Sequence, residues 1–256
     1  MGEKKRIKLE VAYDGTNYHG WQIQPEAITI ESELNKNLSE LLREDIKVIG
    51  ASRTDAGVHA YGNVAVFDTV SRIPSEKIGL ALNTRLPEDI RIQSSREVPE
   101  DFHPRHCDSV KTYEYHILNT NIPIPTERLY SYFFYRSLNI EKMQEAAGYL
   151  IGEHDFKSFC SAKTQVTETV RIIYQLDVFR EGNFVKIRVS GNGFLYNMVR
   201  IITGTLLQVG IGYYQPEEMA IMLEQKDRTV AGACAPARGL RLVNIYYPDL
   251  EKSKSI

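Results

Sequence analysis

Residues 6–13 read RIKLEVAY, and polar and apolar side chains alternate along this segment. The odd-numbered residues from Ile7 to Tyr13 are apolar or aromatic, whereas the even-numbered ones include Lys8 and Glu10. A period of two predicts a β-strand with one buried face. The turn sequence DGTNYHG follows at residues 14–20 and ends the strand.

A helix is predicted directly after this turn. Apolar residues recur at helical spacing between Ile30 and Leu42. Thr29 suits the N-cap position, and Glu31 and Glu33 suit the positive end of the helix dipole.

The remainder of the first hundred residues completes a regular order of elements. Strands are predicted at 46–51 and 62–69, a helix from about Ser75 to Thr84, and a strand from Ile90 to Ser94. The resulting order, β-α-β-β-α-β, is the ferredoxin-like pattern.

The second half of the chain repeats this order. A helix is predicted after Asn139, a long apolar helix after Gly193 and a shorter helix after Pro216. Strands are predicted at 112–118, 171–179, 184–190 and 240–246.

The repeat predicts an α+β protein of two ferredoxin-like halves, with antiparallel sheets flanking a central cleft. We expect an N-terminal domain at 1–104 and a C-terminal domain at 105–256. The boundary falls near Pro99–Cys107, where the sequence FHPRHCD breaks the periodicity.

Composition narrows the classes of protein that the chain can be. Of 256 residues, 43% are hydrophobic and 25% are charged, which excludes a disordered, collagen-like or coiled-coil chain. A net charge of -2 gives no indication of a nucleic-acid partner and by itself favours a small-molecule enzyme. Three widely spaced cysteines and the lack of an apolar leader favour the cytoplasm, without membrane attachment.

The densest polar cluster is ASRTDAGVHA at residues 51–60, which holds Arg53, Asp55 and His59. Asp followed by Ala-Gly is also ordinary turn chemistry, so the cluster alone does not establish a catalytic site.

Arg200 lies within the apolar sequence FLYNMVRIITGTLL, residues 194–207. A helix that is hydrophobic on most sides is largely buried, and a buried guanidinium needs an anionic partner. Either a structural carboxylate or an active-site carboxylate could be this partner. An arginine beside an aspartate lowers the pKa of the carboxyl and keeps it ionised.

Basic residues gather between residues 157 and 200, which contain seven basic and three acidic side chains, Lys163 among the basic ones. Lys186 and Arg188 alternate with the apolar residues of a predicted strand, so they share its polar face. This stripe suits a phosphate backbone, although a solvated face would look the same.

Two further motifs are too incomplete to indicate a cofactor. The spacing of His103, His106 and Cys107 resembles that of a zinc site but lacks a second cluster. Gly210-Ile-Gly212 follows a helix and does not complete a dinucleotide-binding fingerprint. Neither motif therefore predicts a bound metal ion or a dinucleotide.

Five segments together resemble the tRNA pseudouridine synthase A (TruA) family. They are YDGTNYHGWQIQ, SRTDAGVHA, KTYEYHI, FLYNMVRIITGTLLQVG and APARGL, which follow in the family's order. The resemblance implies two ferredoxin-like halves around a basic cleft. It also implies a cofactor-free isomerase that converts uridine to pseudouridine at positions 38–40 of the tRNA anticodon stem-loop, and a homodimer whose two subunits contact tRNA.

The resemblance also implies roles for individual residues. Asp55 matches the catalytic aspartate, Arg200 its arginine partner, and Tyr113 the tyrosine that packs on the target base. Arg53 matches a residue associated with RNA engagement and base extrusion. The expected catalytic residues are Asp55, Arg200 and Tyr113, and the expected substrate-binding residues are Tyr113, Arg53, His59, Lys186 and Arg188.

These residue types suit the chemistry, because a carboxylate can attack the ribose C1′ or act there as a base. The sequence leaves these two roles open. A noncatalytic RNA-binding module would not need an aspartate with an arginine partner. A carboxylate-dependent glycoside hydrolase would need a second carboxylate, and no motif provides one.

Overall fold

The computed structural model describes residues 3–161 and 167–252, which form two compact units. The first unit contains the described residues up to Ser109 together with those from Leu242 onward, and the second contains Val110–Arg241. Lys163 of the predicted basic stripe lies outside the described residues. Among the described residues, no helix has both the length and the apolar character that crossing a bilayer requires.

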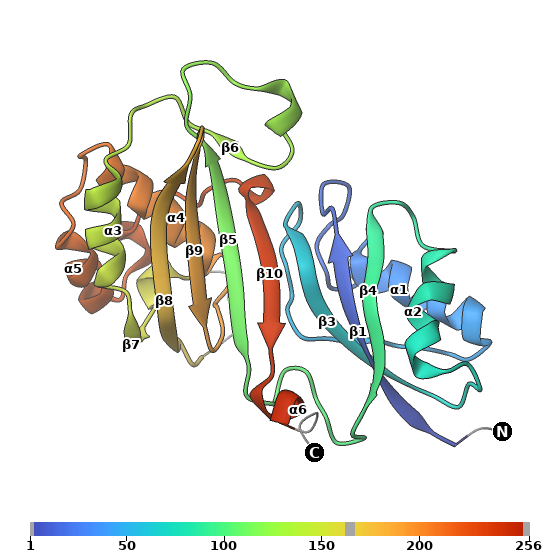
Figure 1. Cartoon of the computed structure of the whole chain (residues 1–256). Coiled ribbons are helices and arrows are strands. Elements are labelled where there is room, and N and C mark those ends of the chain that lie inside the picture. Colours follow the sequence, from blue (N-terminus) through green and yellow to red (C-terminus); the bar gives the residue numbers. More distant parts are fainter. Residues whose placement is uncertain (1–2, 162–166, 253–256) are drawn as a thin grey trace. The chain divides into compact units, whose positions relative to one another are not determined.

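The first unit has the predicted order β-α-β-β-α-β. The strands β4, β1, β3 and β10 are neighbours in its sheet, and β2 pairs with β3. The pairs β1–β3, β1–β4 and β2–β3 are antiparallel. Helices α1 and α2 lie on one face of this sheet (Figure 1). The bounds are β1 Lys5–Tyr13, α1 Ile30–Leu42, β2 Ile49–Gly50, β3 His59–Thr69, α2 Ser75–Asn83, β4 Ile90–Val98 and β10 Leu240–Tyr246.

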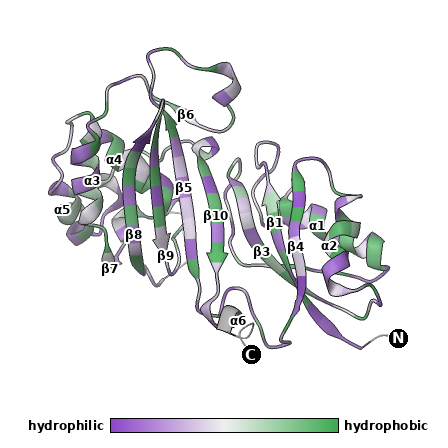
Figure 2. Ribbon diagram, viewed as in Figure 1, coloured by the Kyte–Doolittle hydropathy of each residue, from purple (hydrophilic) through white to green (hydrophobic). Residues whose placement is uncertain are grey.

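The alternation in RIKLEVAY sets the core of the first unit. Ile7, Leu9, Val11 and Tyr13 of β1 are all buried, and Leu34 and Leu38 of α1 are buried with them. Strands of both units alternate in hydropathy (Figure 2). The Thr29 hydroxyl accepts a hydrogen bond from the backbone N–H of Ser32, which confirms the predicted N-cap.

The last strand of the chain explains why this division differs from the expected domains 1–104 and 105–256. Strand β10 hydrogen-bonds alongside β3, so residues from Leu242 onward belong to the first unit. Tyr247 strengthens this attachment, because its hydroxyl donates to the Pro104 carbonyl at 2.8 Å. Pairing between strands so distant in sequence leaves no local signal.

The second unit is also a sheet covered by helices on one face (Figure 1). Its strands run in the order β5-β9-β8-β7, all antiparallel, and the short β6 is parallel to β5. The predicted hairpin is confirmed as β8–β9, whereas β6 and β7 were not predicted. The bounds are β5 Val110–Leu118, β6 Tyr132–Phe133, α3 Ile140–Gly148, β7 Gly152–Asp155, β8 Val170–Glu181, β9 Phe184–Gly191, α4 Met198–Gly210 and α5 Glu218–Gln225.

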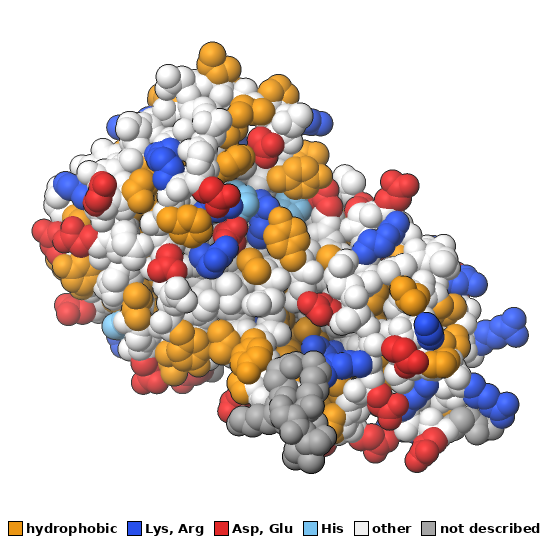
Figure 3. Space-filling view, in the orientation of Figure 1, with side chains coloured by type: hydrophobic (Ala, Val, Ile, Leu, Met, Phe, Trp, Pro, Cys, Tyr) orange, Lys and Arg blue, Asp and Glu red, His pale blue; other side chains and the backbone are white. Residues whose placement is uncertain are grey.

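The two faces of this second sheet differ in character. Val185, Ile187 and Val189 of β9 are buried, and the residues between them, including Arg188, are on the opposite face. Helix α4 is buried along almost its whole length, as its apolar sequence predicts. On the molecular face drawn in Figure 3, Lys and Arg side chains are interspersed with Asp and Glu.

Candidate active site

Asp55 lies in the loop between β2 and β3, residues 51–58, which we call the Asp loop. The backbone N–H of Val58 donates to the Asp55 carbonyl at 3.1 Å, and Gly57 has a φ of +76°. The Asp-Ala-Gly sequence therefore forms the tight turn expected of it. Asp55 is half-buried and Arg53 is exposed.

A network of buried hydrogen bonds anchors the Asp loop to β1 and β3. The hydroxyl groups of Tyr13 and Thr54 are hydrogen-bonded at 2.7 Å. The side-chain amide of Asn63 donates to the Tyr13 hydroxyl at 3.2 Å and to the Ser52 carbonyl at 3.0 Å. Sequence reasoning missed Tyr13 and Asn63, although a polar Asn63 inside the apolar strand NVAVF was a usable signal.

The segment DGTNYHGW, residues 14–21, packs against the same loop. The backbone N–H of Trp21 donates to the Thr54 carbonyl at 3.0 Å, and the backbone N–H of Gly57 donates to the Tyr18 carbonyl at 3.3 Å. A Cβ on Gly15 would lie 2.0 Å from the Val58 carbonyl oxygen, so only glycine allows this approach. The motif therefore serves as a support for the Asp loop.

His59 is buried at the start of β3 and faces the turn at residues 14–15. Its Nδ1 lies 3.1 Å from the Gly15 N–H and 3.1 Å from Asp14 Oδ1. The imidazole thus joins the end of the Asp loop to the adjacent turn. Its expected contact with substrate stays a prediction.

Tyr113 and Arg200 both lie in the second unit. Tyr113 is on β5, on the face that the helices cover, and it is buried. Its ring packs edge-on against Phe194 with centroids 5.2 Å apart. Phe194 belongs to the segment that leads into α4, the helix that carries Arg200.

Arg200 is half-buried rather than fully buried. Its Nε donates to the Ala235 carbonyl at 2.8 Å, and its Nη1 donates to Asn197 Oδ1 at 2.7 Å. Asn197 has a φ of +61° and also donates to the Ser161 hydroxyl at 2.8 Å. Two fixed acceptors therefore orient the planar guanidinium.

The charge of Arg200 also acts on Tyr115, the next inward-facing residue of β5. Burial raises the pKa of the Tyr115 phenol well above its usual range, and Arg200 opposes that rise. The Tyr115 hydroxyl donates to the Pro236 carbonyl at 2.7 Å. Tyr115 therefore stays protonated at neutral pH and links β5 to the segment that binds Arg200.

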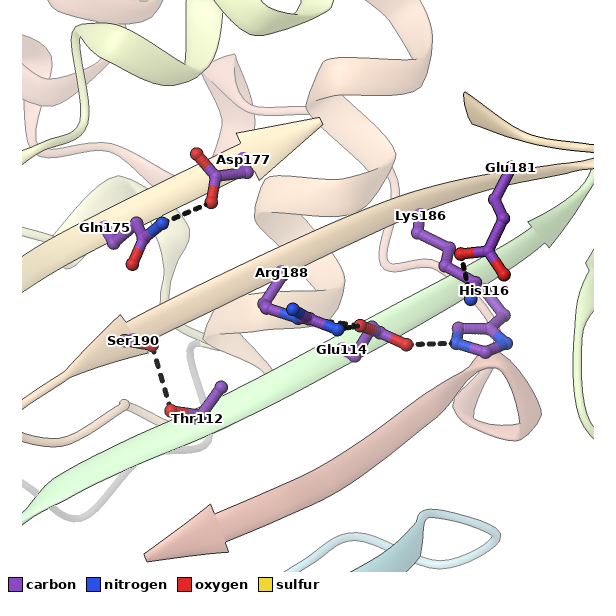
Figure 4. A network of polar contacts seen from close by, with 9 residues as sticks. All are labelled: Thr112, Glu114, His116, Gln175, Asp177, Glu181, Lys186, Arg188 and Ser190. Carbon is purple, nitrogen blue, oxygen red and sulfur yellow. Dashed lines mark hydrogen bonds and ion pairs between the residues drawn. The ribbon is translucent and has the colours of Figure 1, made fainter. Parts of the chain in front are cut away.

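Lys186 and Arg188 lie on the sheet face opposite Tyr113, within a network of polar contacts (Figure 4). Arg188 Nε donates to Glu114 Oε2 at 2.8 Å, and Lys186 Nζ lies 2.8 Å from Glu181 Oε2. Both cations thus have carboxylate partners on the surface where a phosphate contact was expected.

Glu114 is the most enclosed carboxylate of this network. Burial alone would raise the pKa of Glu114, but hydrogen bonds with His116 and Arg188 outweigh it and lower that pKa. For His116 the effect of burial has the opposite sign, because burial disfavours the charged imidazolium, and it is the main reason that the pKa of His116 is lowered. At neutral pH a charged Glu114 therefore lies beside a neutral His116.

The structure thus divides the expected site residues between the two units. Asp55, Arg53 and His59 belong to the first unit, and Tyr113, Arg200, Lys186 and Arg188 belong to the second. The juxtaposition of Asp55 with Arg200 stays a prediction. Within residues 3–161 and 167–252, no group of three His, Cys, Asp or Glu side chains could hold a metal ion.

Comparison with known proteins identifies the family. The sequence model described as tRNA pseudouridine synthase matches residues 10–106 and 146–248, which include segments of both units. The chain therefore belongs to the tRNA pseudouridine synthase family, a family of isomerases. This confirms the resemblance on which the residue assignments depend.

Individual relatives match the chain over nearly its full length. A tRNA pseudouridine synthase A of Ruminiclostridium cellulolyticum is 52% identical over 95% of this chain and 100% of its own. Those of Bacillus subtilis and Thermoanaerobacter sp. are each 46% identical over the same shares. Among solved structures, the archaeal box H/ACA sRNP Nop10-Cbf5 complex aligns with 92% of this chain and 46% of that chain. Its TM-score of 0.33 at 11% identity supports no conclusion.

Proposed function

We propose that this protein isomerises uridine to pseudouridine at positions 38–40 in the anticodon stem-loop of tRNA, without a cofactor. The observation that carries the proposal is the Asp loop, in which a half-buried Asp55 is presented by a turn anchored on two sides. Family membership supplies the substrate class, and the motif SRTDAGVHA supplies the identity of the carboxylate.

The reaction needs a fixed, ionised carboxylate. The bond from the ribose C1′ to uracil N1 breaks, the base turns, and a bond from C1′ to C5 forms. C5 then loses its proton and N1 gains one, so the reaction is an isomerisation. Asp55 either attacks C1′ or removes a proton from the sugar, and both roles require the anion.

The nucleotide must leave the base stack before this chemistry can occur, at a cost of a few kcal/mol. We propose that the aromatic ring of Tyr113 holds the flipped uracil, because a flat surface accepts the base in either orientation. The edge contact with Phe194 supports this role by fixing the plane of the ring.

Arg200 is proposed to pair with the Asp55 carboxylate and to keep it ionised by lowering its pKa. The hydrogen bonds from Arg200 to Asn197 and Ala235 support the assignment, because they fix the orientation of the guanidinium. A pre-oriented guanidinium binds a carboxylate with less loss of side-chain freedom.

A further set of residues is proposed to contact or to support contact with RNA. Arg53 is exposed in the Asp loop, two residues before Asp55, which supports a role in engaging RNA. His59 supports the loop from within. Lys186 and Arg188 pair with carboxylates, so part of their charge is already balanced where phosphate contacts are proposed.

The remaining expectations follow from family resemblance. We propose two ferredoxin-like halves that flank a cleft, a homodimer and a cytoplasmic location. The β-α-β-β-α-β order of the first unit supports the first of these. The absence of any disulfide among the three cysteines, all of which the structure describes, is consistent with a reducing compartment.

The direct test uses tRNA from a strain that lacks the gene. Pseudouridine mapping before and after the gene is restored should show sites at positions 38–40 that depend on this protein. Dependence of pseudouridine at other tRNA positions instead would contradict the assigned specificity. If no tRNA site changes, the proposed function itself is wrong.

A further inference from the structure

The buried polar network that holds the Asp loop contains side chains to which the chemistry described so far gives no individual role. We propose that Tyr13, Thr54 and Asn63 are positioning residues, which hold the Asp55 carboxylate in place by fixing the loop that carries it. The inference rests on the proposed function, in which Asp55 acts on the ribose.

Asn63 is the fixed end of this network. It is fully buried on β3, and each polar group of its side chain has a hydrogen bond. Its amide N–H groups donate to the Tyr13 hydroxyl and the Ser52 carbonyl, and its Oδ1 accepts from the Val64 N–H at 2.9 Å. A buried amide with all its partners in place has one orientation.

Tyr13 connects Asn63 to the Asp loop through hydrogen bonds of its hydroxyl group. Its hydroxyl oxygen accepts from the Asn63 amide, and the same hydroxyl group is hydrogen-bonded to Thr54 Oγ1 at 2.7 Å. The register of β1 on β3 shifts between Val11 and Tyr13, so Tyr13 lies opposite Ala60. The extra residue of this β-bulge lies in β3, the strand that directly follows the Asp loop.

The contacts bracket the residues immediately before Asp55. Asn63 binds the Ser52 carbonyl, Tyr13 binds the Thr54 side chain, and the Trp21 N–H binds the Thr54 carbonyl at 3.0 Å. Residues 52–54 are thus held at both ends. A displacement of a catalytic group by about 1 Å can reduce a rate about 100-fold, so rigidity here affects catalysis directly.

The test compares two buried hydroxyl groups in the same unit. Tyr13→Phe removes the hydroxyl beneath the loop, and the matched control Tyr247→Phe removes a buried hydroxyl that donates to the Pro104 carbonyl. Both variants should show similar losses of Tm. Only Tyr13→Phe should reduce the single-turnover rate of pseudouridine formation, by about tenfold or more, with the Kd for tRNA within about threefold.

Substitutions at Thr54 provide the conservative rescue. Thr54→Val keeps the shape but removes the hydroxyl, and it should reduce the rate as Tyr13→Phe does. Thr54→Ser keeps the hydroxyl and should restore most of the rate. The double variant Tyr13→Phe/Thr54→Val should be no slower than Tyr13→Phe alone, because Tyr13→Phe already removes the hydrogen bond that Thr54→Val removes.

A second readout does not depend on activity. Hydrogen exchange of residues 51–58 should be about tenfold faster in Tyr13→Phe and unchanged in Tyr247→Phe. A wild-type single-turnover rate in Tyr13→Phe, or unchanged exchange of the Asp loop, would each overturn the inference. If the wild-type protein forms no pseudouridine, the proposed function fails separately, and exchange alone decides whether the network orders the loop.

Discussion

Gly20 is the position where a single methyl group should disturb both stability and the Asp loop. It has a φ of +86°, and a Cβ there would lie 2.5 Å from the Thr54 carbonyl oxygen. Gly20→Ala therefore combines backbone strain with a clash against backbone. Gly212 is a matched control, because it has a φ of +78° and nothing within 4 Å of its Cβ position.

The expected magnitudes follow from separating these two effects. An L-residue at such a φ costs about 1–2 kcal/mol, which is the loss expected for Gly212→Ala. Overpacking adds about 1–3 kcal/mol in Gly20→Ala, because the Thr54 carbonyl must move. That carbonyl precedes Asp55 in the chain, so the single-turnover rate should fall about tenfold or more in Gly20→Ala alone.

Urea denaturation of both variants and the wild-type protein measures the free energy of unfolding, and rapid mixing with excess enzyme measures the single-turnover rate. If the free energies of unfolding of the two variants differ by less than about 0.5 kcal/mol, the clash does not exist and the packing described around Thr54 is wrong. A wild-type rate in Gly20→Ala would show that the Thr54 carbonyl does not position Asp55.

Two other predictions concern the second unit. The pKa of Glu114 is lowered in the folded state, so its contribution to stability is present above the unfolded value of about 4.3 and is lost as pH falls through the folded pKa. Glu114→Gln should therefore lower the unfolding free energy by about 2 kcal/mol at pH 7, and by progressively less below about pH 4, in urea titrations at several pH values. Glu181 is exposed, so Glu181→Gln should lower the unfolding free energy by less than about 1 kcal/mol. Equal losses of unfolding free energy in Glu181→Gln and Glu114→Gln would show that burial does not distinguish the two carboxylates. Arg200→Lys keeps the charge but loses the planar fork with its two fixed acceptors, so the rate should fall about tenfold or more while tRNA still binds. A lysine variant that retains wild-type turnover would show that charge alone is enough.

Local patterns were sufficient to predict the class of fold. The alternation in RIKLEVAY, the caps at Thr29 and Asn139 and the hairpin β8–β9 each depend on residues close in sequence. These features are encoded by side-chain periodicity and by short-range hydrogen bonds, so no tertiary information is needed.

Features that depend on distant pairing were missed or placed differently. The contact of Asn63 with Tyr13 joins residues 50 positions apart, and β10 pairs with a strand from the opposite end of the sequence. The carboxylate partners of Lys186 and Arg188 depend on hairpin geometry and on the register of β5 with β9. Alternation along a strand shows that two residues share a face, but it does not show what covers that face.

The same difference between local patterns and distant contacts applies to the site residues. Asp55 was predicted from its motif, and its surroundings come from strands that the motif does not contain. Arg200 was expected to be buried because its helix is apolar, but it is half-buried, whereas its neighbours Val199 and Ile201 are buried. Successive positions of a helix face different directions, and the hydropathy of the segment does not show which direction is covered.

The most direct measurement of the central claim is pseudouridine formation by Asp55→Asn on unmodified tRNA. The account predicts no detectable product under single-turnover conditions, with tRNA affinity within about tenfold of wild type, which is 1.4 kcal/mol. Asparagine nearly matches the size of aspartate but provides neither a nucleophile nor a base. Substantial pseudouridine formation by this variant would contradict the assignment of Asp55 as the catalytic carboxylate.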